Sequence, residues 1–217
     1  LKAVQDFNIK LYPGEIAGLI GPNGAGKTTV FNLLTKVYQP TRGTIMVDGK
    51  DTAGMSTVQV SKLGVARTFQ NIRLFSNLSV EDNVKLGMHN QIKYGMFRGI
   101  LRLPIAEKKA GSLPSGAQRR LEIVRALGTN PNLLLLDEPA AGMNPSETAE
   151  LMENIIKIRD TFQIAIMLIE HDMNLVMGIC EGICVLNFGK VIAKRTPADI
   201  QSNPVGLEAY LGRKKEA

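Results

Sequence analysis

A glycine-rich loop that ends in a lysine and two hydroxyl residues is the part of this sequence best suited to chemistry. Residues 21–29 read Gly-Pro-Asn-Gly-Ala-Gly-Lys-Thr-Thr, which matches the spacing of a phosphate-binding loop. Glycines let backbone N–H groups turn toward phosphate oxygens, and a helix N-terminus adds partial positive charge. We expect Lys27 to reach the outer phosphates of a nucleotide and Thr28 to offer its hydroxyl to Mg²⁺. The other loop residues expected to contact the nucleotide are Asn23, Gly24, Ala25, Gly26 and Thr29.

The segments on both sides of this loop favour a binding loop over a glycine-rich turn that binds nothing. Residues 15–20 form a short apolar run that is typical of a buried strand. Residues 28–34 have the pattern of a helix start. A phosphate-binding loop requires this order of strand, loop and helix, so the context supports the motif.

Two acidic residues follow a second apolar run. Four leucines at 133–136 predict a buried strand, and Asp137 and Glu138 come directly after it. A carboxylate at the end of such a strand can hold Mg²⁺ beside a phosphate loop, and we expect Asp137 to do so through water. Glu138 is expected to polarise the attacking water as a general base. The alternative is a strand that ends in a charged turn.

Gln70 and His171 each follow a further predicted strand. An amide side chain can both ligate Mg²⁺ and orient water, which are the roles expected of Gln70. His171 ends an apolar strand that could neighbour the strand before Asp137, so we expect it to sense a γ-phosphate. The other histidine, His89, has no such context and is expected at the surface or in packing.

Strand and helix patterns alternate along the chain, which favours an α/β domain. The predicted strands cover residues 8–12, 15–20, 44–47, 64–69, 133–136 and 164–169, and a hairpin is expected from 183–187 and 190–193. Asn144 and Glu147 have the spacing of a capping box around Pro145, which predicts a helix that runs to about Asp160. Residues 76–108 are less regular and are expected to belong to a helical lobe.

Composition limits the class of protein. No apolar run in the 217 residues reaches the roughly 18–20 residues of a membrane-spanning helix. Cys180 and Cys184 have no third ligand nearby and are expected to be buried thiols in a reducing, cytosolic compartment. The net charge of +6 comes from dispersed basic residues without interleaved aromatic residues, so we expect a solvated surface rather than a lipid-facing or nucleic-acid-binding one.

The phosphate loop, Gln70, a segment at 113–118, the Asp137–Glu138 pair and His171 follow one another in an order that resembles the ATP-binding cassette (ABC) ATPases. The resemblance covers essentially the whole chain, so residues 1–217 are expected to form one nucleotide-binding domain with 71–118 as its helical lobe and signature region. Within that family the chain is similar to the LivG-type ATPase subunits of branched-chain amino-acid importers. The stretches that carry this similarity are 21–32, 67–70, 119–123, 137–145, 169–173 and 203–212.

The resemblance implies a P-loop NTPase core with a mixed sheet, an antiparallel β subdomain and a shortened α-helical lobe. It implies ATP and Mg²⁺ as cofactors, with ATP hydrolysis driving a transmembrane permease. The implied partners are a second ABC ATPase subunit, in a homodimer or heterodimer, the permease, and indirectly a periplasmic or extracellular amino-acid-binding protein. The implied location is peripheral, on the cytoplasmic face of the inner or plasma membrane, and no nucleic-acid partner is expected.

Three rival functions stay open at this stage. An exporter ATPase of the lipopolysaccharide type shares much of the sequence of the phosphate loop and of the segment around Gln70. A nucleic-acid or ribosome-acting ABC protein usually has two cassettes, long coiled-coil insertions or zinc sites, none of which is evident in this sequence. A nucleotide-binding regulator without turnover is motivated by the unusual residue Pro114.

The signature segment departs from the usual Leu-Ser-Gly-Gly-Gln. It reads Leu-Pro-Ser-Gly-Ala-Gln at 113–118, so Pro114 stands where the phosphate-binding serine is expected. Proline offers neither a hydroxyl nor an N–H group. We therefore expect Ser115 or Gly116 to provide the contact to the nucleotide of the partner subunit.

Two other departures concern the length of the chain, and one more concerns Asn144. Only 44 residues lie between Gln70 and Ser115, which is short for this family by about a helix pair. The aromatic residue that stacks on adenine in the family is expected upstream of residue 1, and Val4 is expected to pack near the ribose. Asn144 replaces an aspartate common among relatives, which leaves the predicted helix cap intact.

Overall fold

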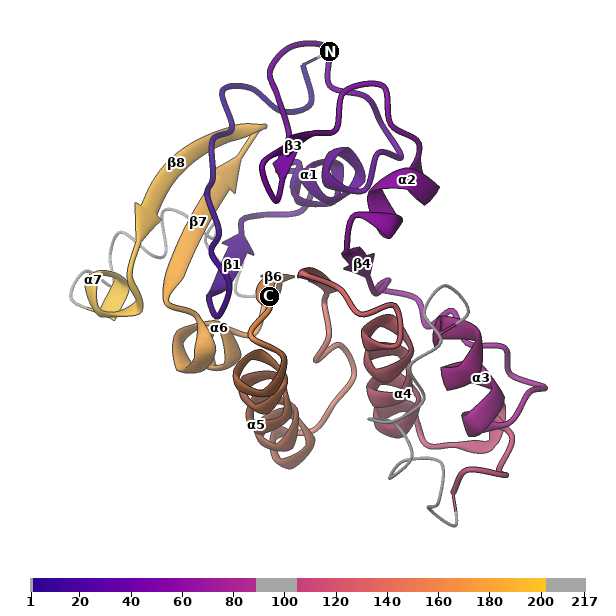
Figure 1. The fold of residues 1–217 in the computed structure, drawn as a ribbon. Coiled ribbons are helices and arrows are strands. Elements are labelled where there is room, and N and C mark those ends of the chain that lie inside the picture. Colours follow the sequence, from indigo (N-terminus) through magenta and orange to yellow (C-terminus); the bar gives the residue numbers. More distant parts are fainter. Residues whose placement is uncertain (1, 89–104, 202–217) are drawn as a thin grey trace.

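A six-stranded mixed sheet forms the centre of the molecule (Figure 1). The computed structural model describes residues 2–88 and 105–201. The strand order is β4-β5-β6-β1-β7-β8, in which β8 is antiparallel to β7 and all the other neighbours are parallel. The strands are β1 (Ile16–Ile20), β4 (Val65–Arg67), β5 (Leu133–Asp137), β6 (Ala165–Ile169), β7 (Gly182–Asn187) and β8 (Lys190–Arg195). The predicted mixed sheet is thus confirmed.

Helices cover both faces of this sheet because alternate strand residues point to opposite sides. On one face, Leu19, Leu135 and Met167 pack with side chains of α1 (Lys27–Leu34) and α2 (Thr57–Lys62). On the other face, leucines and isoleucines of the same strands, such as Leu134 and Leu136, form a larger cluster. That cluster includes α4 (Ser115–Leu127), α5 (Pro145–Phe162) and α6 (Met173–Ile179). The sheet is buried on both sides, which explains its continuous apolar strands.

A small helical lobe lies beside the sheet next to β4 (Figure 1). It contains α3 (Val80–Gly87), a short 3₁₀ turn (Ala110–Ser112) and the first part of α4. Gly87 allows α3 to approach α4 closely, since a Cβ atom there would lie 2.2 Å from the carbonyl oxygen of Arg125. The predicted lobe at 71–118 also includes 89–104, which lie outside the described residues together with His89.

Two local predictions are confirmed by hydrogen bonds and turns. The side chain of Asn144 accepts from the N–H of Glu147, and the Glu147 side chain accepts from the N–H of Asn144, which completes the capping box at the start of α5. Strands β7 and β8 form the predicted hairpin, joined through Phe188 and Gly189.

The prediction of a strand at 8–12 is wrong, because these residues join no ladder of the sheet. The nearby chain makes only an isolated bridge between Gln5 and Lys190. Two other predicted strands are shorter than expected. The strand at 44–47 is reduced to β2 (Met46–Val47), which pairs with β3 (Lys50–Asp51) in a two-stranded antiparallel sheet, and β4 ends at Arg67 rather than Phe69.

The described chain ends in a short helix, α7 (Pro197–Gln201). The family-like ending at 203–212 lies beyond it, outside the described residues. Within the described ranges, no helix is long and apolar enough to cross a membrane.

Candidate nucleotide site

The glycine-rich loop joins β1 to α1 through three glycines in left-handed conformations. Gly21, Gly24 and Gly26 have φ values of 150°, 78° and 105°. A Cβ atom on Gly21 would lie 2.0 Å from the carbonyl oxygen of Leu186 in β7, whereas one on Gly24 would meet nothing within 4 Å. The loop is therefore packed against the sheet at its first glycine and open at Gly24, where a ligand can approach the backbone.

Lys27 begins α1 and turns back over its own loop. Its Nζ donates to the carbonyl oxygens of Gly21 at 2.6 Å and Pro22 at 3.1 Å, and the residue is 6% exposed. Burial lowers the pKa of Lys27, whereas the charges of Glu138 and Asp137 raise it. No ion pair of the described residues includes Lys27, so a cation lies here without a direct counter-charge.

Glu138 lies where three predicted site residues converge. Strands β5 and β6 are neighbours, and their carboxyl ends bring Glu138 beside His171. The Oε2 atom of Glu138 accepts from Nε2 of Gln70 at 2.7 Å, and its Oε1 atom lies 3.2 Å from Nε2 of His171. The backbone of Glu138 is left-handed, with φ 48°, a strained conformation of the kind found at functional sites.

Arg119 of α4 fixes the segment that carries Gln70. Its Nη1 donates to the carbonyl oxygen of Phe69 and its Nη2 to that of Gln70, both at 2.7 Å. Arg119 is 5% exposed and also pairs with the buried Glu122. The helical lobe and the amide that contacts Glu138 are thus joined by one guanidinium.

Two charged residues near the site were not predicted from the sequence. Arg67 donates to the carboxylate of Asp137 at 2.6 Å, and only its position three residues before Gln70 could have suggested this. Glu170 is 4% exposed and accepts from the N–H groups of Ala140 at 2.7 Å, His171 at 2.9 Å and Asp172 at 3.4 Å. It therefore ties the loop after β5 to the loop after β6.

The signature segment lies at the start of α4. Pro114 is the N-cap and makes no side-chain hydrogen bond. Ser115 is exposed, and Gly116 is buried at a position where a Cβ atom would lie 3.0 Å from Oε1 of Glu147. Within the described part of the chain, no hydrogen bond joins Ser115 or Gly116 to residues 21–29, so the structure does not bring these two parts together.

Val4 does lie against the phosphate loop. The ideal Cβ position on Gly26 is 3.3 Å from Cγ2 of Val4. The neighbouring backbone is held there because Gln5 donates to the carbonyl oxygen of Gly189, which in turn donates to that of Ala25. Val4 thus lies beside the loop, and its contact with a bound nucleotide stays a prediction.

The oxygen atoms around the loop suit Mg²⁺ held jointly with phosphate. Thr28 has an exposed hydroxyl, and Asp137 and Gln70 offer hard oxygen donors of the kind that Mg²⁺ prefers. Among the described residues, no group of three or more histidine, cysteine or acidic side chains is placed to hold a metal ion alone. The donor set therefore fits an ion that keeps water and phosphate oxygens as its other ligands.

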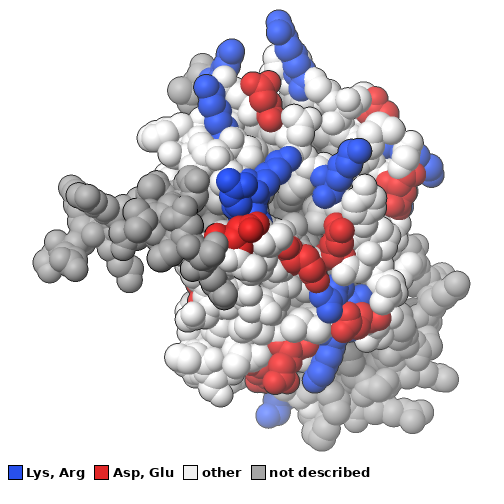
Figure 2. All heavy atoms as spheres, turned by 90° about the vertical axis from the view of Figure 1, so that its left-hand side faces the viewer, with Lys and Arg blue, Asp and Glu red and all other residues white. Residues whose placement is uncertain are grey.

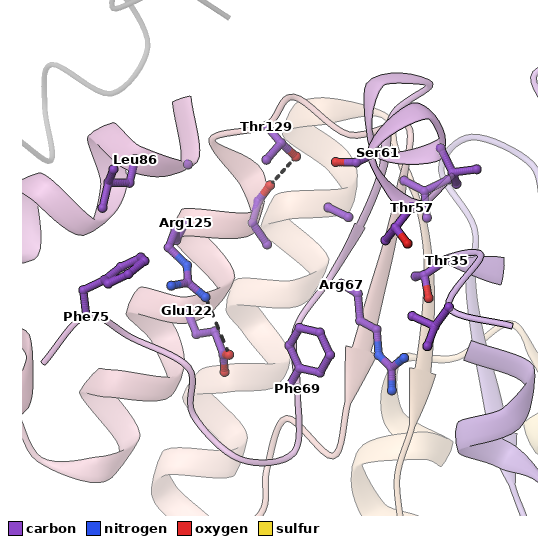
Figure 3. Close-up of a pocket in the computed structure, with 16 residues that line it drawn as sticks. Thr35, Thr57, Ser61, Arg67, Phe69, Phe75, Leu86, Glu122, Arg125 and Thr129 are labelled. Carbon is purple, nitrogen blue, oxygen red and sulfur yellow. Dashed lines mark hydrogen bonds and ion pairs between the residues drawn. The ribbon is translucent and has the colours of Figure 1, made fainter. Parts of the chain in front are cut away.

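A groove separates the helical lobe from the core (Figure 3). Its volume is about 350 Å³, and it is lined by α2, β4, α3 and α4 residues that include Arg67, Phe69, Glu122 and Arg125. Apolar side chains are exposed along it at Val37 (51%), Phe75 (54%) and Leu86 (46%). None of its lining residues belongs to the loop at 21–29.

Figure 2 shows the charges on one face of the molecule. Basic and acidic side chains lie interspersed there, without separation into a single basic field.

Comparison with known proteins identifies relatives along nearly the whole chain. A family model described as ABC transporter matches residues 4–141. LivG of Escherichia coli K12, a high-affinity branched-chain amino acid transport ATP-binding protein, is 46% identical and aligns with 98% of this chain and 92% of its own length. BraF of Pseudomonas aeruginosa, which has the same description, is 41% identical with the same coverage. The lipopolysaccharide export protein LptB of Acidithiobacillus ferridurans is 32% identical over 96% of this chain and 90% of its own.

The alignment with LivG spans 236 positions, more than the 217 residues of this chain, so it includes gaps on the side of this chain. That these gaps lie between Gln70 and Ser115 stays a prediction.

Solved structures have the same fold. One described as an ATP-binding cassette of an ABC transporter matches with a TM-score of 0.85 and 25% identity, over 97% of this chain and 93% of that one. Another, from the cbiONQ transporter complex of Clostridium perfringens, matches with a TM-score of 0.83 and 25% identity, over 95% and 87%. With the family model and these relatives in agreement, the chain belongs to the ABC transporter family and is an ATP-binding, ATP-hydrolysing subunit of that family.

Proposed function

We propose that this chain is the ATPase of an importer for branched-chain amino acids, and that ATP is hydrolysed at the loop, Glu138 and His171. The observation that carries the catalytic part is the contact of Glu138 with both Gln70 and His171. The transported substrate is supported by the similarity to LivG and BraF, which exceeds the similarity to the exporter subunit LptB.

The loop and Lys27 bind the phosphates in this proposal. When the nucleotide binds, the ammonium of Lys27 exchanges its hydrogen bonds to the carbonyl oxygens of Gly21 and Pro22 for hydrogen bonds to phosphate oxygens. These oxygens carry the opposite charge, so the new bonds are stronger. The N–H groups of residues 23–29 and the start of α1 add to this attraction. Val4 packs at the ribose side of the loop.

Mg²⁺ would be held by Thr28, Gln70 and Asp137 together with the phosphates, where it neutralises charge on the γ-phosphate. The role of Glu138 follows from its position at the end of β5. Its carboxylate takes the proton of the attacking water, and the amide of Gln70 holds the other carboxylate oxygen. His171 contacts the same carboxylate and is placed to recognise the γ-phosphate beside it.

The partner subunits are inferred from the parts of the site that this chain leaves open. A second ABC ATPase, identical or related, would supply its own Ser115 or Gly116 equivalent to the nucleotide bound here. A transmembrane permease would contact the groove through an apolar segment that covers Val37, Phe75 and Leu86. Cross-linking from a cysteine introduced at Leu86 to the permease would locate that contact, and its failure in an active complex would exclude the groove.

These partners would place the chain on the cytoplasmic face of the inner or plasma membrane as a peripheral subunit. A periplasmic or extracellular amino-acid-binding protein would act on it only through the permease. No nucleic-acid partner is proposed.

The catalytic proposal is tested by steady-state hydrolysis with Glu138→Gln. We expect at least a hundredfold lower rate with nucleotide binding retained, because an amide cannot accept the proton. Glu153→Gln is the matched control, since Glu153 lies on α5 with its side chain 72% exposed. Hydrolysis by Glu138→Gln at the parental rate would show that Glu138 is not the base.

The transport proposal is tested in vesicles that contain this chain with its neighbouring permease. ATP-dependent uptake of leucine, isoleucine or valine in the presence of the binding protein is the expected result. Stimulation of hydrolysis by lipopolysaccharide instead of by the loaded binding protein would favour the exporter.

A further inference from the structure

Arg67 places a guanidinium directly on the carboxylate of Asp137. Its Nη2 lies 2.6 Å from Oδ2 of Asp137, and the two side chains are 6% and 7% exposed. This is a charge-assisted hydrogen bond in a nearly dry setting, where such contacts are strong. It joins the end of the edge strand β4 to the end of its neighbour β5.

Three neighbours hold Arg67 in this position. Its Nη1 donates to Oδ1 of Asn32 in α1 at 2.7 Å. Its guanidinium carbon lies 5.3 Å from the ring centre of Phe31 and 5.0 Å from that of Phe69. Figure 3 shows Arg67 and Phe69 side by side at the groove. The cation is thus anchored independently of Asp137 and cannot easily turn away from it.

The contact occupies one oxygen of the carboxylate and leaves the other available. Among the described residues, no side chain or N–H group donates to Oδ1 of Asp137. The backbone N–H of Asp137 is separately held by Oγ1 of Thr68 at 3.3 Å. The carboxylate is therefore fixed in rotation, with a cation on one oxygen and no hydrogen-bond donor from the described residues on the other.

We propose that Arg67 positions the carboxylate of Asp137 and serves as the counter-cation of that carboxylate when no Mg²⁺ is bound. This inference rests on the proposed Mg²⁺ role of Asp137. The guanidinium prevents the buried carboxylate from repelling the phosphates of an incoming nucleotide, and Mg²⁺ takes over part of that task on binding. The stabilisation that Mg²⁺ can add to nucleotide binding is correspondingly smaller while Arg67 is present.

Three variants separate charge from hydrogen bonding. Arg67→Gln retains a neutral N–H donor toward Asp137 but removes the cation. Arg67→Lys retains the cation without the second arm to Asn32. Arg73→Gln is the matched control, because Arg73 is exposed and its guanidinium carbon lies 4.0 Å from the centre of the Phe69 ring, which Arg67 also contacts. Among the described residues, Arg73 makes no ion pair with Asp137.

The measurement is calorimetric binding of the non-hydrolysable ATP analogue AMP-PNP, once in EDTA and once in excess Mg²⁺. The readout is the dissociation constant in EDTA divided by the dissociation constant in Mg²⁺. We expect Arg67→Gln to raise this ratio about tenfold, chiefly through weaker binding in EDTA, since a charge-assisted hydrogen bond has about this strength. Arg67→Lys should change the ratio less than about twofold, and Arg73→Gln should leave it unchanged.

A merely structural role would raise both dissociation constants by the same factor. An unchanged ratio in Arg67→Gln would therefore overturn the inference. If Arg67→Gln does not fold alone, the same idea predicts that Mg²⁺ with AMP-PNP restores its folding and that AMP-PNP in EDTA does not. A variant that stays unfolded in both conditions would also overturn it. Absence of AMP-PNP binding by the parent protein would instead refute the proposed function.

Discussion

At the residue scale, the site is organised around a cation whose charge is only partly balanced. Lys27 donates to two neutral carbonyl oxygens, while the carboxylates of Asp137 and Glu138 act on it through space. Asp137 is already engaged by Arg67, and Glu138 by Gln70 and His171. The carboxylates are therefore held away from Lys27, which leaves the ammonium available to an anionic ligand.

Two glycines of the loop should respond differently to the same substitution. Gly21→Ala should lower the free energy of unfolding by about 3 kcal/mol or more, because the new Cβ would meet a backbone oxygen at 2.0 Å in a left-handed conformation. Gly24→Ala should cost only about 1 kcal/mol of stability, because its surroundings are open and only the left-handed backbone is strained. Its main effect should be weaker nucleotide binding.

Urea unfolding and nucleotide titration of both variants check this contrast. Equal losses of stability in Gly21→Ala and Gly24→Ala would contradict the packing described for the loop.

The two cysteines should be unreactive in the native protein. Burial raises the pKa of Cys180 to about 12 and that of Cys184 to about 11, so at pH 8 at most about a thousandth of either thiol is the reactive thiolate. We expect iodoacetamide to leave both unmodified in the native state and to alkylate both in guanidinium chloride, as measured by mass spectrometry. Rapid native labelling of either residue would contradict the burial of Cys180 at the end of α6 and of Cys184 in β7.

At the element scale, features encoded by local chemistry could be predicted from the sequence. The capping box at Asn144 and the hairpin around Phe188 and Gly189 are confirmed because a few adjacent residues determine them. The prediction of a strand at 8–12 is wrong because an alternating pattern cannot show whether a sheet edge is available for pairing. The Arg67–Asp137 pair bridges 70 positions, and only the strand order β4-β5 reveals it.

Glu170 should control two loops together. In Glu170→Gln, the amide oxygen can still accept from one side, but the NH₂ group faces N–H donors of Ala140 or of His171 and Asp172. We expect a loss of about 1–3 kcal/mol in the free energy of unfolding, the cost of an unpaired buried N–H group. The turnover rate should fall several-fold with little change in nucleotide affinity, since Glu138 and His171 lie on the displaced loops.

Chemical denaturation and steady-state kinetics, with Glu153→Gln as the exposed control, check this prediction. An unchanged turnover rate in a destabilised Glu170→Gln protein would reduce Glu170 to a purely structural residue.

The raised pKa of Glu170 predicts that the stability of the protein depends on pH. Burial raises the pKa of Glu170 from 4.5, although the N–H groups of Ala140, His171 and Asp172 lower it, and the charge of Glu138 raises it further. A carboxyl group whose pKa is higher in the folded state binds its proton more tightly there, so its contribution to stability is lost as pH rises from about 4.5 through the raised value. Stability measured against pH should therefore fall more steeply in this window for the parent than for Glu170→Gln. Parallel curves would contradict it.

At the scale of the whole molecule, the proposed nucleotide site lies on one lobe, while the predicted signature segment lies on the other. In Figure 1, α1 and α4 lie on opposite sides of β4, and Ser115 is exposed at the start of α4. Arg119 joins this helix to the Gln70 segment, so a displacement of α4 would act on the segment whose side chain contacts Glu138. A partner that displaces α4 on binding at Ser115 would thereby affect the carboxylate of Glu138.

Ser115→Glu should block assembly without preventing nucleotide binding. An acid in the first turn of α4 favours the helix, so the monomer should remain folded. The same charge would repel the phosphates of a nucleotide bound by a second subunit. In a Glu138→Gln background, we expect ATP to produce a dimer in size-exclusion chromatography with light scattering, and Ser115→Glu to leave a monomer whose ATP affinity is within about twofold of the parent. Thr57→Glu places the same charge in the exposed first turn of α2 and should dimerise normally. A dimer that forms equally well with Glu at position 115 would show that the start of α4 does not face the partner's nucleotide.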